Sequence, residues 1–205
     1  MATNKVIRLN CGHWDSNKVD RARKKAKKLG EIKNSILKGG GNVAGYLGEE
    51  AVASYINAKI TSCNKGTDKY DYDITTQDGR RVEIKTKRRT VPCICERGPN
   101  KGSDQGHYEV SVAKTSVHQR PDLYIFVSIQ FKNVKEDAEG KRLYYNIENI
   151  EILGQMKPED YFAKAWLVQK GDHDASNDFT AHTDMYNLYI RDLEPLDDSL
   201  LPQKQ

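Results

Sequence analysis

Two carboxylates and a lysine on neighbouring segments could perform chemistry on a phosphodiester. The segment Val-Glu-Ile-Lys at residues 82–85 holds Glu83 and Lys85 two positions apart, and Asp73 lies ten positions before Glu83. Because side chains alternate faces along an extended strand, Glu83 and Lys85 share one face. An acid and a lysine side by side on a strand, with a second carboxylate nearby, form an arrangement that binds a divalent cation and hydrolyses phosphodiesters.

The turn between the two segments decides whether these side chains meet. Residues 77–79 read Gln-Asp-Gly, and a three-residue hairpin loop would end on this glycine in the left-handed conformation. In that register Asp73 lies opposite Glu83, and a single face carries Asp71, Asp73, Glu83 and Lys85. A two-residue loop would turn Asp73 to the other face. Crowded carboxylates repel, and a metal ion removes the penalty. The alternative is an exposed hairpin with a polar outer face.

A helix ahead of the hairpin supplies a third carboxylate. Residues 45–56 place apolar side chains on one stripe at helical spacing. Glu49 flanks this stripe, whereas Glu50 points away from it. A carboxylate at the rim of a buried helix face can add a ligand to a site on the sheet beneath. The alternative is that both glutamates only favour the positive N-terminal end of the helix dipole.

Together, these segments resemble the PD-(D/E)xK nuclease superfamily, which has the restriction-endonuclease-like fold. The matching motifs are Gly-x-x-Gly-Glu-x-x-Val at residues 45–52, Tyr-Asp-Ile at 72–74 and Val-Glu-Ile-Lys-Thr at 82–86. The resemblance covers about residues 45–131. It implies an α/β fold class: a mixed central β-sheet flanked by helices, with a basic N-terminal helix and a C-terminal α+β extension.

The resemblance also implies roles for four side chains. Asp73 and Glu83 would hold Mg²⁺, for which Mn²⁺ can substitute, and Glu49 would complete the metal shell. Lys85 would orient the attacking water or stabilise the charged transition state. The proline that usually precedes the aspartate is replaced here by a tyrosine, so Asp71 stays open as the alternative to Asp73.

Basic residues are concentrated ahead of the helix and around the second strand. The chain of 205 residues has a formal net charge of +4, and residues 18–38 carry nine Lys or Arg against two acids. This charge pattern favours contact with a phosphate backbone, the alternative being a merely solvated helix. The predicted nucleic-acid contacts are Arg23, Lys24, Lys27, Lys28, Arg81, Lys87 and Arg88.

The remaining sequence is organised around the nuclease-like segments. We expect a basic N-terminal helical segment at 1–41, a nuclease core at 42–131, strands and a helix completing the same domain at 132–195, and a disordered tail at 196–205. No apolar run approaches the ~20 residues that cross a bilayer, and the first ten residues lack a signal-peptide core. A cytoplasmic location follows, in the host if the protein is phage-encoded, and we expect the four cysteines to be thiols.

These features predict a Mg²⁺-dependent nuclease that hydrolyses phosphodiester bonds of DNA in restriction, recombination, repair or phage DNA processing. The alternative is a nucleic-acid-binding module that keeps the nuclease fold without the activity. The four intact side chains favour the enzyme, because a degenerate module need not keep them all. DNA is the expected partner, no membrane is expected, and a homodimer is left open.

Overall fold

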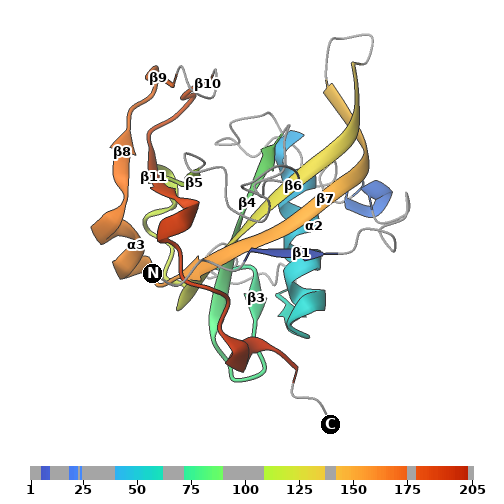
Figure 1. Cartoon of the computed structure of the whole chain (residues 1–205), viewed down its shortest axis with the longest axis vertical. Helices are drawn as coiled ribbons and strands as arrows, with labels where there is room; N and C mark the ends of the chain where they lie inside the picture. Colours follow the sequence, from blue (N-terminus) through green and yellow to red (C-terminus); the bar gives the residue numbers. More distant parts are fainter. Residues whose placement is uncertain are drawn as a thin grey trace, which may run out of the picture.

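A mixed six-stranded sheet is the largest element of the fold. The structure of the protein is a computed structural model, and it describes residues 6–9, 19–22, 24, 40–61, 72–89, 109–136, 142–174 and 179–202. The strand order is β1-β7-β6-β4-β3-β2. These strands are β1 (Ile7–Leu9), β2 (Lys59–Ile60), β3 (Ile74–Thr75), β4 (Arg81–Arg89), β6 (Leu123–Glu136) and β7 (Arg142–Met156). β4 and β6 run parallel and the other neighbours antiparallel, and β6 and β7 are long and curved (Figure 1).

A second, three-stranded sheet has the order β5-β11-β8. Its strands are β5 (Glu109–Ala113), β8 (Trp166–Val168) and β11 (Met185–Tyr189). The helices are α2 (Gly40–Tyr55) and α3 (Pro158–Lys164), and the short elements are η2 (Lys114–Ser116), η3 (Ile190–Asp192), η4 (Asp198–Leu200), β9 (His173–Asp174) and β10 (Phe179–Thr180). Figure 1 shows the second sheet and α3 grouped on the left, with α2 behind β6 and β7.

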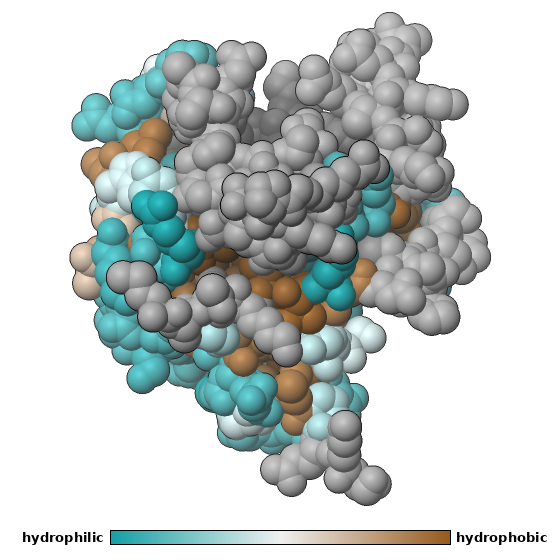
Figure 2. All heavy atoms as spheres, viewed as in Figure 1, coloured by the Kyte–Doolittle hydropathy of each residue, from teal (hydrophilic) through white to brown (hydrophobic). Residues whose placement is uncertain are grey.

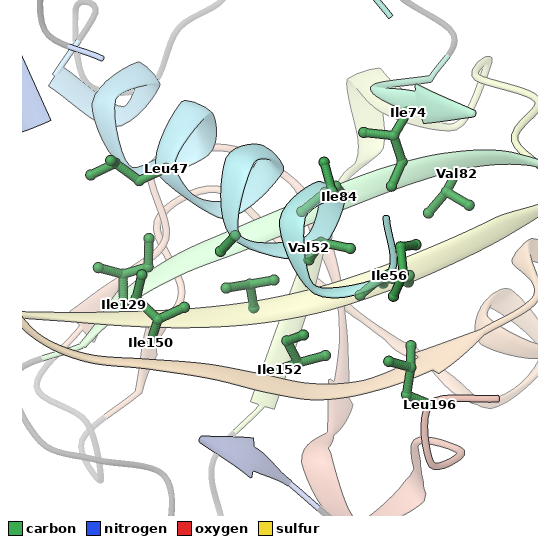
Figure 3. Close-up of a cluster of buried hydrophobic side chains, with 14 of the residues drawn as sticks. Leu47, Val52, Ile56, Ile74, Val82, Ile84, Ile129, Ile150, Ile152 and Leu196 are labelled. Atoms are coloured by element: carbon green, nitrogen blue, oxygen red, sulfur yellow. The ribbon is translucent and has the colours of Figure 1, made fainter. Parts of the chain in front are cut away.

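Two hydrophobic clusters lie on opposite faces of the large sheet. The first lies under α2, where Leu47, Val52 and Ile56 fill the space between the helix and the strands (Figure 3). The second lies against α3 and the second sheet. Alternation along β6 divides its side chains between the two, because Ile125 belongs to the first cluster and Phe126 to the second. The large sheet is therefore buried on both faces, by different kinds of element.

The prediction of an α/β core with helices on both faces of the sheet is wrong. Among the described helices, only α2 covers the sheet as a layer; α3 has seven residues, and residues 19–22 form a short helical stretch. The second sheet, with α3, covers the other face, so the described chain is mostly β. The physical reason is that the segments after β4 carry β-branched and aromatic residues. These favour strands, and they pair as one long antiparallel hairpin, β6–β7.

The C-terminal residues close the first cluster. Leu196 and Leu200 are buried in it; the sequence predicted a disordered tail at 196–205, of which the structure describes residues 196–202. Arg80, beside the hairpin turn, binds Asp197 at 3.2 Å, which ties this stretch to the hairpin. On the face shown in Figure 2, hydrophobic residues reach the surface near the centre and hydrophilic residues border them. None of the described helices is long and apolar enough to span a membrane.

Candidate active site

The hairpin that carries Asp73 and Glu83 has the register of a three-residue loop. Ile74 pairs with Val82, which sets Asp73 opposite Glu83, as the sequence predicted. Gly79 closes the turn with a φ of 86°. This conformation is costly for a residue with a side chain, so the glycine helps to fix the register. The predicted pairing of the two segments is therefore confirmed.

The carboxylate of Asp73 takes the place of a backbone group in the strand ladder. Asp73 lies one residue before β3, and its Oδ2 accepts a hydrogen bond from the amide of Ile84 at 2.7 Å. The carboxylate therefore lies beside the backbone of β4, near the plane of the sheet. Side chains from either face of the sheet can approach it there.

Three carboxylates influence one another at this edge of β4. Burial raises the pKa of Asp73 well above its usual range, and the negative charges of Glu83 and then Glu49 raise it further. The Ile84 amide and the Lys85 ammonium oppose the shift without cancelling it. Glu49 comes from α2 on one side of the sheet, whereas Glu83 comes from the strand itself. The structure thus brings Glu49, Asp73, Glu83 and Lys85 together.

Lys85 is held by two oxygen atoms. Its Nζ donates to Glu83 Oε1 at 2.7 Å and to Gln119 Oε1 at 3.0 Å, and its side chain is 17% exposed. The Nζ also lies 5.9 Å from the centroid of the Tyr124 ring. Burial and the charge of Glu83 raise the pKa of Tyr124 to about 12, so its buried hydroxyl stays protonated. The predicted motif residues include neither Gln119 nor Tyr124, because the contacts of these two side chains with Lys85 do not follow from a local pattern.

Helix α2 packs tightly against β4 at a glycine. A Cβ at Gly48 would lie 2.0 Å from Thr86 Oγ1 and 3.1 Å from Thr86 Cβ. The missing side chain therefore lets the helix rest on the strand, which brings the adjacent Glu49 to the site. Sequence reasoning used Gly48 only as part of a motif. A glycine inside a helical pattern, which costs stability unless packing requires it, was the available signal.

Two of the predicted nucleic-acid contacts already have acidic partners. Lys87 Nζ lies 2.6 Å from Oε1 of Glu109, whose side chain is 9% exposed. Arg81 binds Asp122 through its backbone amide and its guanidinium group. Both cations therefore have a structural partner in the protein itself, whatever else they contact.

The other predicted contacts are less completely placed. Lys24 is exposed beside the helical stretch 19–22, and Arg88 is half-buried on β4. Several predicted residues lie outside the described part of the chain: Arg23, Lys27, Lys28, the alternative ligand Asp71 and the four cysteines. Their roles stay predictions.

The carboxylates at the edge of β4 suit a hard divalent cation without forming a closed cage. Within the described residues, no three His, Cys, Asp or Glu side chains are already arranged to hold a metal ion. Mg²⁺ needs no such cage, because it is usually bound by one or two carboxylates together with water and substrate phosphate. The mutual repulsion at Asp73 is the feature that a cation would relieve. The side chains therefore fit the ion.

Replacing Asp73 with asparagine should stabilise the metal-free protein. The raised pKa means that the ionised carboxylate costs folding free energy at neutral pH, and asparagine removes that charge. It keeps a carbonyl oxygen for the Ile84 amide. We expect the Tm in chelator to rise by roughly 2–4 °C, which corresponds to about 1 kcal/mol in a domain of this size. Thermal unfolding measures this change in Tm, and Glu148→Gln, at an exposed glutamate, is the control. A lower Tm for Asp73→Asn would contradict the repulsion.

The sequence also matches a known family over the region that holds the site. Residues 33–139, more than half of the chain, match the family described as bacteriophage T4 endonuclease IV. The matched region contains Glu49, Asp73, Glu83, Lys85 and Gln119. A search of the curated proteins finds no match.

Proposed function

The chain belongs to the bacteriophage T4 endonuclease IV family, and on that premise we propose that it is a Mg²⁺-dependent endonuclease that hydrolyses phosphodiester bonds of DNA during phage DNA processing. The observation that supports this most is the meeting of Glu49, Asp73, Glu83 and Lys85 at one edge of β4. We also propose that the site is of the PD-(D/E)xK type, and the acids and the lysine on α2 and the β3–β4 hairpin support this.

In this proposal Asp73 and Glu83 hold Mg²⁺ and Glu49 completes its shell. When bound, the ion polarises the scissile phosphate and makes a coordinated water more acidic. Ionising Asp73 beside the other carboxylates costs free energy, because their negative charges repel one another. An approaching cation removes this cost. The metal-free site is therefore prepared for a positive ligand.

Lys85 makes the protein's own contribution to the reaction. Of the three N–H donors on its ammonium group, two are used by Glu83 and Gln119. The third is available for the attacking water or for a phosphate oxygen. Because both partners fix the side chain before substrate arrives, the positive charge is already in place when negative charge builds up on the phosphate.

Cleavage of DNA should require a divalent cation. Closed circular DNA is the suitable substrate, because only an endonuclease opens it, and both duplex and single-stranded circles can be supplied. We expect nicked or linear products with Mg²⁺ or Mn²⁺ and none with chelator, measured on gels. A parallel preparation of Glu83→Ala controls for contaminating nucleases. Undiminished cleavage in chelator would sink the metal mechanism, and binding without cleavage under all conditions would replace the enzyme by a binding module.

A further inference from the structure

A hollow of about 400 Å³ opens beside the proposed catalytic side chains. Its apolar walls are formed by Val117, Pro121, Pro158 and Phe162. A volume of this size lies at the lower end of the range for pockets that bind small organic groups. Most of the exposed lining is apolar, and the acidic Glu159 also lines the hollow, so the hollow suits a weakly polar group better than a phosphate.

The hollow and the candidate active site share residues. Gln119 lines the hollow, and its Oε1 accepts the 3.0 Å hydrogen bond from Lys85. Arg81 lines it as well, and alternation along β4 puts Arg81 on the same face as Glu83 and Lys85. The hollow therefore begins one side chain away from the lysine that is expected to contact the reacting phosphate.

Two side chains of the hollow are held in fixed orientations. The ring of Phe162 forms T-shaped pairs with the rings of Tyr161 and Tyr186, at centroid distances of 5.4 and 5.3 Å. Arg120, which also lines the hollow, donates through Nη1 to the carbonyl oxygens of Val117 and Gln119 at 2.7 and 3.2 Å. An aromatic ring and a guanidinium group are thus presented without further ordering, which lowers the cost of binding.

Resting on the proposed nuclease function, we propose that this hollow holds the base of a nucleotide next to the cleaved phosphodiester. A phosphate at Lys85 brings the adjoining nucleotide to the mouth of the hollow, because the two are covalently linked. The ring of Phe162 offers a stacking surface for a base, and the exposed Arg120, which also lines the hollow, suits the backbone phosphate. A base in the hollow is unstacked from its neighbours, so the protein selects DNA in which that base is free to leave the stack.

Oligonucleotides with one abasic residue test this assignment. The abasic residue is moved through successive positions around a mapped cleavage point, and kcat/KM is measured with the wild-type protein and with Phe162→Ala. We expect one position to lower kcat/KM by roughly 10- to 100-fold, as removal of a base–aromatic stack does. Phe162→Ala should cause a similar loss on the intact strand and no additional loss on that abasic strand, because both changes remove the same contact. Exposed Leu167→Ala on β8 is the matched control and should behave as wild type.

A second variant is needed because the Phe162 ring also packs against the second cluster, so Phe162→Ala removes core contacts as well. Val117→Trp fills the hollow and should lower cleavage of the intact strand but not of the abasic strand. Equal rates at every abasic position, or a full additional loss when substitution and abasic residue are combined, would overturn the base subsite while leaving the nuclease intact.

Failure of the proposed function gives a different result. If the wild-type protein cleaves nothing, binding is followed by the fluorescence of oligonucleotides in which 2-aminopurine replaces one base at successive positions. A fluorescence change at one position that is lost in Val117→Trp supports the subsite without any cleavage. The absence of such a position overturns it.

Discussion

Glu83→Ala and Asp73→Ala should abolish both metal binding and cleavage, whereas Lys85→Ala should lower the cleavage rate and spare metal binding. The two acids supply the oxygen ligands, so their loss removes the cation and with it the polarisation of the phosphate. Lys85 supplies positive charge without being a ligand. Removal of one such preorganised charge-stabilising group lowers kcat by roughly 100- to 1,000-fold.

Isothermal titration with Mn²⁺ and single-turnover cleavage separate the two kinds of loss. Glu50→Ala is the matched control for a glutamate on the same helix, because Glu50 is not part of the cluster at Asp73. Glu49→Ala should weaken metal binding and Glu50→Ala should not. If Asp71→Ala lost the metal while Asp73→Ala retained it, Asp71 would be the primary ligand. If Lys85→Ala cleaved at the wild-type rate, the lysine would have only its structural contact with Glu83.

Gly48→Ala should damage both stability and activity, although it adds a single methyl group. The new Cβ would meet Thr86 Oγ1 at 2.0 Å, Cβ at 3.1 Å and Cγ2 at 3.2 Å, so rotating the threonine side chain does not remove the conflict. The helix must lift from β4, and overpacking of this kind costs about 1–3 kcal/mol. Because Glu49 moves with the helix, a shift of roughly 1 Å is expected to lower the cleavage rate by up to about 100-fold.

Gly45→Ala provides a control of opposite sign in the same helix. No atom lies within 4 Å of a Cβ at Gly45, so the added methyl meets nothing. Alanine is a better helix former than glycine by roughly 0.5–1 kcal/mol, and the Tm should rise slightly with activity unchanged. Thermal unfolding and cleavage assays on both variants decide the matter. Equal behaviour of the two alanine variants would show that the contact with Thr86 does not position α2.

Local features of the sequence predicted the hairpin, but they did not predict which elements pack on the faces of the large sheet. The register depended on one turn, and Gly79 identified it. The covering of the sheet depends on contacts between distant segments, and nothing in the sequence showed that β5, β8 and β11 would form a second sheet where helices were expected. Gln119 illustrates the same limit, because it meets Lys85 only after β4 and β6 have paired in parallel.

The sequence separation between paired residues differs greatly between the hairpin that carries Asp73 and Glu83 and the outer edge of the sheet. Asp73 reaches Ile84 across 11 positions, whereas Arg8 on β1 reaches Glu151 on β7 across 143. Closing the longer loop costs roughly 2 kcal/mol more in chain entropy, since this cost grows with the logarithm of loop length. Asp73 and Glu83, two of the three residues expected to bind the ion, are therefore brought together by a short closure with a low entropy cost. Strand β1, at the edge of the sheet, pairs with β7 only when regions far apart in the sequence come together.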